Sequence, residues 1–273
     1  MNSAELNDFV CNQAAQPQDN PILQGNFAPV DVENSFDHLE VVGTIPEDLQ
    51  GTLLRTGPNP VHPGPNHHWF LGDGMLHAIQ LGNGQAKRYV NRWVRTKALE
   101  EKTGLPAANG GSQQELLNQG SGNVNVVGHG DRVLALPEVG LPHEMDTQLD
   151  TKGLFDYAGK LTSNMTAHPK IDGQTGQMLF FGYELLEPTV RYHEASAAGD
   201  LVKTIDIALP QSIMMHDFGV TETRVVFMDL PVVFNVEVLE QGFAFPFQWS
   251  DSHQSRLGIM NRSSDGDNVQ WID

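Results

Sequence analysis

The sequence predicts an all-β fold, and two observations lead to that prediction. From Leu39 onward, short runs rich in β-branched and aromatic residues alternate with clusters of turn-forming residues. Three segments also resemble one another, residues 132–138 (RVLALPE), 177–184 (QMLFFGYE) and 224–231 (RVVFMDLP), and their starts lie 45 and 47 residues apart. A period near the ~40–45 residues of a four-stranded propeller blade favours a propeller over a sandwich or barrel with coincidental spacing.

The order of elements follows from turn and helix signals. Residues 1–30 are polar and interrupted by prolines, which predicts an extended N-terminal strap, with regular structure beginning near Leu39. Residues 97–117 combine helix formers with glycine and proline, which predicts an inserted, partly helical loop. Residues 31–273 form one predicted domain. Its turns are expected at residues 82–84, 130–131, 172–173, 199–200 and 265–267.

Composition excludes several functional classes. The chain has 16 Lys and Arg against 34 Asp and Glu, a formal charge of −18, so it offers no basic surface to nucleic acid. The single cysteine, Cys11, cannot form an internal disulfide. Residues 1–5 (MNSAE) lack the basic and apolar regions expected of a signal peptide, and no apolar run reaches the roughly 18 residues of a membrane span. We expect a cytoplasmic protein.

Two histidines stand at nearly equivalent positions of the repeat. His168 precedes the second repeated segment by nine residues, and His216 precedes the third by eight. Equivalent positions of successive blades converge near a propeller axis, so the two imidazoles could bind one metal ion. The corresponding position of the first repeat falls at residues 123–124, an Asn-Val pair.

Structural roles are the alternative for these and the other histidines. His168 could cap a turn before Pro169, and His216 could be a core residue paired with Asp217. His129 and His253 are out of register with the repeat and are predicted to be solvated turn residues. Four more histidines lie close together in sequence, but their spacing matches no compact metal-ligand pattern: His62, His67, His68 and His77.

Several motifs resemble the carotenoid cleavage oxygenases, a family that includes apocarotenoid-, epoxycarotenoid- and stilbene-cleaving enzymes. The similarity begins with residues 49–60 (LQGTLLRTGPNP) and 68–77 (HWFLGDGMLH) and covers roughly residues 20–273. Further motifs occur in the order found in the family: residues 91–96 (NRWVRT), 132–138 (RVLALPE), 141–146 (LPHEMD), 166–169 (TAHP) and 214–218 (MMHDF).

The resemblance implies a seven-bladed β-propeller that holds Fe(II) by four histidines, one ion per complete subunit. His168 and His216 match the first two ligands. Glu138 matches the first of three glutamates that accept a hydrogen bond from the outer nitrogen of a ligand imidazole. The segments that carry the third and fourth histidines do not appear, so we expect residues 31–273 to be an incomplete propeller lacking its C-terminal portion.

By the same resemblance, the expected reaction is cleavage of a conjugated C=C bond of a carotenoid or apocarotenoid by O2, giving carbonyl products. The substrate is a lipophilic polyene, and peripheral contact with a membrane would serve its uptake. Pro137 stands where stilbene-cleaving relatives carry a lysine, which favours a carotenoid. Eight phenylalanines could line a substrate tunnel, although most are expected in blade cores: Phe155, Phe180, Phe181, Phe218, Phe234, Phe243, Phe245 and Phe247.

Three alternatives stay open. The chain could be a non-catalytic propeller remnant that binds lipophilic ligands or nothing, because half of the expected ligands are absent. It could belong to a stilbene-cleaving dioxygenase. A hydrolytic, lactonase-like propeller would need oxygen ligands, for which Glu184, Asp217 and Asp229 are candidates, but their spacing does not favour it.

Overall fold

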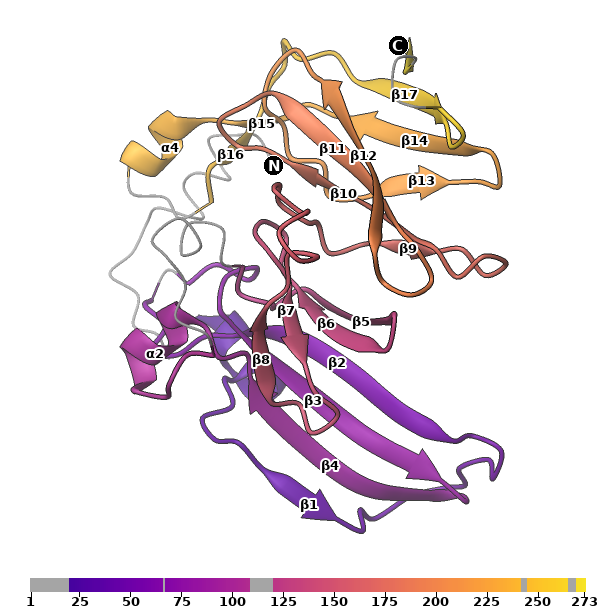
Figure 1. The fold of residues 1–273 in the computed structure, drawn as a ribbon. Helices are drawn as coiled ribbons and strands as arrows, with labels where there is room; N and C mark the ends of the chain where they lie inside the picture. The colour runs from indigo at the N-terminus through magenta and orange to yellow at the C-terminus, as the bar shows by residue number, and fades with distance from the viewer. Residues whose placement is uncertain (1–19, 66, 109–119, 242–244, 265–268) are drawn as a thin grey trace.

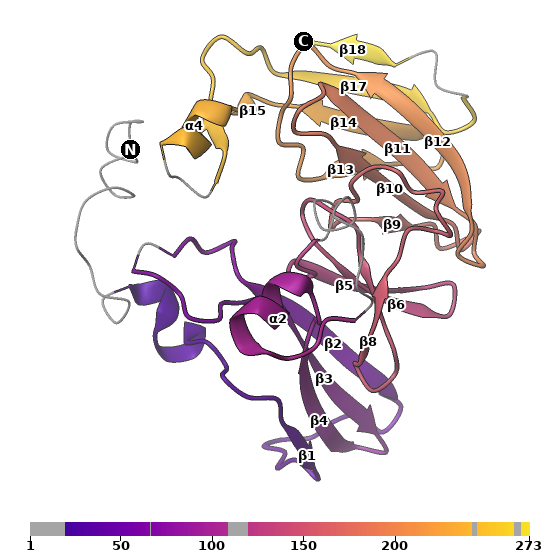
Figure 2. The same cartoon turned by 60° about the vertical axis from the view of Figure 1, so that its left-hand side comes forward.

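The fold is all-β, as predicted. The computed structural model describes residues 20–65, 67–108, 120–241, 245–264 and 269–273 of the 273-residue chain. Four antiparallel four-stranded sheets follow one another in an arc from the N-terminal to the C-terminal part of the chain (Figures 1 and 2). The predicted turn at residues 265–267 and residues 1–19 of the predicted strap lie outside the described residues, so the strap boundary at residue 30 stays a prediction.

The first sheet has the strand order β1-β4-β3-β2. Its strands are β1 (Ser35–Asp37), β2 (Gly51–Asn59), β3 (Asp73–Gly82) and β4 (Gln85–Trp93). The prediction that regular structure begins near Leu39 is therefore wrong, because β1 is a three-residue edge strand whose pairing with β4 is not visible in local sequence. Two 3-10 turns precede it, Pro21–Leu23 and Gly25–Phe27, and the Asn20 side chain caps the first by accepting from the Ile22 amide at 3.2 Å.

The described helices are short. Helix α2 (Lys97–Thr103) begins where the Thr96 side chain accepts from the Leu99 amide at 3.0 Å, and it ends at Gly104, whose φ of 76° is left-handed. The predicted helical loop is thus helical in its first part, and residues 109–119 are outside the described residues. Helix α4 spans Val236–Glu240. Among the described residues, no helix is long and apolar enough to cross a membrane.

Each of the next three sheets is built by strands that pair in chain order. The second contains β5 (Asn125–His129), β6 (Arg132–Leu136), β7 (His143–Met145) and β8 (Thr151–Leu154); the third contains β9 (Lys170–Ile171), β10 (Met178–Tyr183), β11 (Thr189–Ala195) and β12 (Leu201–Ala208). The fourth joins β13 (Phe218–Val220), β14 (Arg224–Asp229), β17 (Arg256–Asn261) and β18 (Gln270–Ile272). A hairpin of β15 (Val232–Phe234) and β16 (Phe247–Trp249) is inserted with α4 between β14 and β17.

The three repeated segments are the second strands of these three sheets. They contain β6, β10 and β14, each flanked by the first and third strand of its own sheet. The spacing of 45 and 47 residues therefore measures one whole sheet of four strands. This confirms the repeat predicted from sequence and explains why residues just before β9 and β13 occupy equivalent places.

Alternating residues of β10 enter two different cores. Leu179, Phe181 and Tyr183 belong to a cluster shared with the fourth sheet, whereas Met178 and Phe180 belong to a cluster shared with the second. Successive side chains of a strand point to opposite faces, so the third sheet is covered on both faces and all six β10 residues are buried. Sheets stacked face to face in this way form consecutive blades of a propeller.

Candidate metal centre

His168 and His216 lie just before the first strands of two neighbouring sheets. Pro169 separates His168 from β9, and Asp217 separates His216 from β13. The sheets stack with these strand starts close together, so the two side chains meet although 48 residues separate them. The structure thus brings together the two histidines that the repeat register selected.

The two imidazoles face each other through their Nε2 atoms, which are 2.9 Å apart. Their ring centroids are 4.4 Å apart and the ring planes are inclined by 69°. On the opposite side of the His216 ring, Nδ1 lies 2.9 Å from Oε2 of Glu138, two residues after β6. The other Glu138 oxygen, Oε1, accepts a hydrogen bond of 3.0 Å from the hydroxyl of Tyr183 at the end of β10.

This arrangement fits a metal ion held by both rings. Two nitrogens about 2.1 Å from one ion and at right angles around it are about 3 Å apart, close to the 2.9 Å between these Nε2 atoms. Donor atoms of Glu138, His168 and His216 lie within 4.8 Å of one another, and no second such group of His, Cys, Asp and Glu occurs in the described part of the chain. Because Glu138 occupies the Nδ1 side of His216, its position suits orientation of the ring.

The surroundings shift the pKa values of His168, His216 and Tyr183 in different directions. Burial lowers the pKa of His168, and the neighbouring His216 acts in the same direction. The hydrogen bond to Glu138 raises the pKa of His216. Burial raises the pKa of Tyr183 well above its ordinary value, so its hydroxyl keeps the proton that it donates to Glu138.

Asp217 does not pair with His216. Its Oδ1 atom accepts from Lys170 Nζ at 2.7 Å and from the Phe218 amide at 2.7 Å. The His216 side chain is 55% exposed, so it is not a core residue. The alternative of a core histidine paired with Asp217 is therefore wrong, because the Asp217 carboxylate is bound to Lys170 of the neighbouring sheet.

The position before β5 that corresponds to His168 and His216 is occupied by Asn123, which has a structural role. Asn123 is buried, and its amide nitrogen donates to the backbone oxygens of Gly72 at 2.9 Å and Phe70 at 3.3 Å. These bonds tie the second sheet to the loop that enters β3. The first repeat thus uses this position to join two sheets, whereas the next two repeats place imidazoles there.

Two predictions about turn histidines are wrong. His129 is the last residue of β5, partly buried, with Nε2 3.0 Å from the Gly176 oxygen of the next sheet. The His253 side chain is 6% exposed, and its Nε2 lies 2.6 Å from Oδ1 of the fully buried Asp229. Both residues follow turn-like sequence, but the partner in each case comes from a segment more than 20 residues away, which local spacing does not reveal.

Sequence reasoning did not single out His143 and His193, which are buried inside the sheets. Burial lowers the pKa of each to about 4. His193 lies between the hydroxyls of Ser163 at 2.8 Å and Thr204 at 2.9 Å, whereas neither ring nitrogen of His143 has a hydrogen-bonding partner among the described residues. No sequence signal distinguished these two, because each occupies an ordinary strand position.

The carboxylates considered for a hydrolytic site are engaged elsewhere. Asp229 binds Arg256 and His253, and Glu184 binds Arg191 at 3.2 Å. Neither belongs to a group that could hold a metal among the described residues. The structure thus gives no support to a lactonase-like centre.

Aromatic side chains link the molecular surface to the candidate centre. Phe70, which is 58% exposed, has its ring centroid 6.1 Å from that of Phe245. The ring centroids of Phe245 and Phe247 are 5.2 Å apart, and those of Phe247 and Tyr183 are 6.3 Å apart. Tyr183 in turn donates a hydrogen bond to Glu138. We call Phe70, Phe245, Phe247 and Tyr183 the aromatic row.

The phenylalanines considered for a substrate tunnel but outside the aromatic row are buried or partly buried where the structure describes them. Phe180, Phe181 and Phe218 are buried blade-core residues, which confirms their predicted role. Phe155 packs partly buried against the core of the second and third sheets, and Phe234 contacts Phe247 at 6.1 Å. Phe243 lies outside the described residues.

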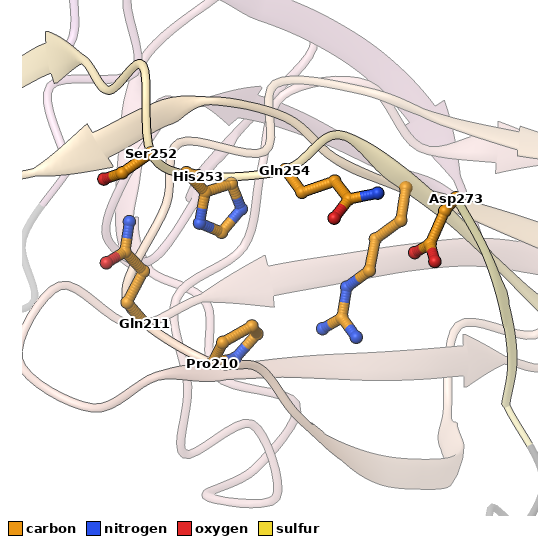
Figure 3. A pocket seen from close by; sticks show the side chains of 7 residues that line it. Pro210, Gln211, Ser252, His253, Gln254 and Asp273 are labelled. Carbon is orange, nitrogen blue, oxygen red and sulfur yellow. The ribbon is translucent and has the colours of Figure 1, made fainter.

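A cavity of about 350 Å³ lies elsewhere, between the loop after β12 and the last sheet (Figure 3). It is lined by Pro210, Gln211, Ser252, His253, Gln254, Arg256 and Asp273. Six of these seven residues are polar and none belongs to the histidine cluster. The cavity therefore suits neither a polyene nor the chemistry of the two facing imidazoles.

Comparisons with known proteins agree with this geometry. Residues 27–273 match the family model described as Retinal pigment epithelial membrane protein. The chain is 35% identical to a carotenoid cleavage oxygenase of Mycobacterium tuberculosis over 303 aligned positions, covering 96% of this chain and 60% of that protein. It is also 35% identical to resveratrol cleavage oxygenase 1 of Aspergillus fumigatus, covering 93% of this chain and 54% of that protein.

Solved structures show the same fold. Lignostilbene dioxygenase of Pseudomonas brassicacearum matches with a TM-score of 0.83 and 29% identity, over 95% of this chain and 57% of that one. Cobalt-substituted apocarotenoid oxygenase of Synechocystis matches with a TM-score of 0.77 and 27% identity, over 96% and 59%. The chain thus spans somewhat more than half the length of the proteins that it matches.

Proposed function

The chain belongs to the retinal pigment epithelial membrane protein family, and on that premise we propose that it carries part of the centre of an Fe(II) dioxygenase. The reaction is cleavage of a conjugated C=C bond of a carotenoid or apocarotenoid by one O2, with one oxygen atom entering each carbonyl product. His168 and His216 are the proposed iron ligands. The observation that carries the proposal is the pair of facing Nε2 atoms 2.9 Å apart, with Glu138 bound behind one ring.

The donor set fits iron chemistry. Neutral imidazoles suit Fe(II), which supplies the activation of dioxygen when bound. His168 and His216 present nitrogen lone pairs, and the Glu138 carboxylate accepts a hydrogen bond from the Nδ1–H group of His216. This bond fixes the ring orientation and places a compensating negative charge near the ion. The cobalt-substituted form of the Synechocystis relative is consistent with a metal site in a protein of this fold.

Two imidazoles are half of the set that the family resemblance implies. Catalysis then requires further ligands beyond those that the described residues offer. Support comes from the two outermost sheets, whose outer faces carry exposed apolar side chains, such as Phe36 and Leu53 in the first and Leu257 and Ile272 in the last. Such faces are suited to covering by further sheets. The 273-residue chain alone is therefore proposed to be inactive.

The substrate class rests on two features. The aromatic row offers an apolar path from the exposed Phe70 to Tyr183 beside the centre, as a long polyene requires. Pro137 offers no donor for a phenolic oxygen, which favours a carotenoid or apocarotenoid. A stilbene is the second candidate, because a resveratrol cleavage oxygenase and a lignostilbene dioxygenase are among the similar proteins.

The protein is proposed to be cytoplasmic and to bind peripherally to a membrane surface, from which it takes up such a substrate. Phe27 and Trp69 are exposed and pack edge to face at 4.7 Å, next to the exposed Phe70. Aromatic side chains of this kind favour the membrane–water interface. Sedimentation with neutral phosphatidylcholine vesicles is expected to fall several-fold in Phe70→Ser. Equal sedimentation of variant and wild type would contradict the membrane role of this residue.

The direct test of the reaction uses a chimera in which the 273 residues are joined to the C-terminal part of a full-length relative. The chimera is loaded anaerobically with Fe(II). Apocarotenals, carotenoids and stilbenes are supplied with ¹⁸O2, and the products are analysed by mass spectrometry. Label in both carbonyl fragments is expected, and His168→Ala and His216→Ala are expected to abolish turnover. Products without label would refute a dioxygenase. Turnover by the 273-residue chain alone would refute the need for further ligands.

A further inference from the structure

We propose that Tyr183 is a positioning residue of the metal centre, which fixes the Glu138 carboxylate and through it the tautomer of His216. This inference rests on the proposed function, since it assigns a role within the same site. Three groups are joined in series: the Tyr183 hydroxyl donates to Glu138 Oε1 at 3.0 Å, and Glu138 Oε2 lies 2.9 Å from His216 Nδ1.

Tyr183 is held rigidly enough to act in this way. It is 1% exposed, lies at the end of the fully buried strand β10 and pairs with Val190 of β11. Its backbone oxygen accepts a hydrogen bond of 3.0 Å from the side-chain Nδ2 of Asn164, and its ring packs edge-on against Phe247. The hydroxyl at the end of this fixed ring meets the Glu138 carboxylate.

Glu138 needs such a partner because it does not lie within a strand. It stands two residues after β6 and its side chain is 21% exposed, so solvent competes for its oxygens. A fixed donor on Oε1 leaves Oε2 as the acceptor for the Nδ1 proton of His216. The proton is then kept on Nδ1, and the Nε2 lone pair faces His168 and the proposed ion.

The same sheet contains a matched control. The buried hydroxyl of Tyr192 on β11 donates to Glu194 Oε1, also at 3.0 Å. That carboxylate lies 3.5 Å from Lys203 Nζ instead of a histidine. Tyr192→Phe therefore removes an equivalent buried hydrogen bond without touching the metal centre.

The test compares Tyr183→Phe, Tyr192→Phe and Glu138→Gln in the full 273-residue chain. Co(II) affinity is measured by visible absorption, and the His216 tautomer in the metal-free protein by long-range ¹H–¹⁵N correlation at about pH 8.5, above the ordinary imidazole pKa. Tyr183→Phe is expected to weaken Co(II) binding about 3- to 10-fold, less than the 10–100-fold typical of a direct partner of a ligand. It should also reduce the share of the Nδ1–H tautomer. Glu138→Gln should weaken binding at least as much, and Tyr192→Phe should change neither quantity.

Equal behaviour of Tyr183→Phe and Tyr192→Phe in both measurements would overturn the proposal. If the wild-type chain binds no Co(II), the proposed metal site fails, but the tautomer measurement still decides the role of Tyr183. An unchanged tautomer in Tyr183→Phe then overturns it, and a changed one supports the hydrogen-bond relay without a metal. Thermal unfolding of both Tyr→Phe variants shows whether their stabilities match.

Discussion

Two pairs of histidines in this chain have opposite surroundings. His168 and His216 lie two residues before the first strands of their sheets, partly exposed, with their Nε2 atoms facing each other. His143 is the first residue of β7 and His193 lies inside β11; both are almost fully buried, with pKa values lowered to about 4. The difference teaches that position within the repeated sheet decides whether an imidazole is available to a metal or becomes a neutral part of the core.

The largest expected effect is the loss of metal binding when either facing histidine is removed. His168→Ala or His216→Ala should lower Co(II) affinity by more than about 100-fold, beyond the 10–100-fold typical for loss of an outer partner, because a ligand itself disappears. Isothermal titration of the 273-residue chain measures this. His193→Ala is the control from the other pair and should keep the wild-type affinity. A comparable loss in His193→Ala would show that binding depends on overall stability.

Acid should destabilise the protein through the buried pair. The folded-state pKa values of His143 and His193 lie below the unfolded value of about 6.5. Between about pH 6.5 and 4 the unfolded chain therefore binds more protons, and stability falls as the pH falls. Each residue contributes a loss of roughly 3 kcal/mol by pH 4 and below. Urea unfolding from pH 7.5 to 4 measures the slope; a flat profile over this range would show that the two rings accept protons without cost.

Removal of His193 at neutral pH should cost stability without affecting the metal. His193→Ala leaves the hydroxyls of Ser163 and Thr204 without this partner and opens a cavity beside Phe180, whose ring stacks on the imidazole at 4.9 Å. We expect a loss of about 2–4 kcal/mol, measured by urea unfolding at pH 7.5. A change below about 0.5 kcal/mol would mean that the site relaxes around the missing ring.

The smallest effect at neutral pH is expected for His143→Leu. The wild-type ring has no hydrogen-bonding partner among the described residues, so an apolar side chain of similar size should change stability by less than about 1 kcal/mol at pH 7.5. At pH 5 the variant should be more stable than the wild type, because it has no buried imidazole to protonate. Lower stability of the variant at both pH values would indicate an unseen polar partner of His143.

Much of the fold and the histidine pair could be predicted from sequence because they depend on periodic features. The segments around β6, β10 and β14 recur at nearly constant spacing, and that register alone separated His168 and His216 from the other histidines. That Glu138 accepts a hydrogen bond from a ligand imidazole followed from family resemblance and from no spacing rule, and the structure identifies that imidazole as His216. Nothing in the sequence predicted that Tyr183 donates to Glu138, since that contact joins residues 45 positions apart on different sheets.

The errors have the same physical origin. His253 has a turn-like sequence around it, but its side chain is buried and bound to Asp229, which is distant in sequence. Strand β1 forms by pairing with the edge of β4. Asn123 stands at the position of the first repeat that corresponds to His168 and His216, yet its side-chain amide binds the loop before β3 and so connects the first two sheets. Local pattern predicts elements and equivalent positions, whereas the partner of each polar side chain is set by how the sheets stack.

The most direct test of the central claim, that His168 and His216 bind one metal ion together, is X-ray absorption at the cobalt edge of the 273-residue chain loaded with one equivalent of Co(II). The account predicts scattering from two imidazoles in the wild type and from one in His168→Ala or His216→Ala. A spectrum with only oxygen ligands, or one that both variants leave unchanged, would contradict it.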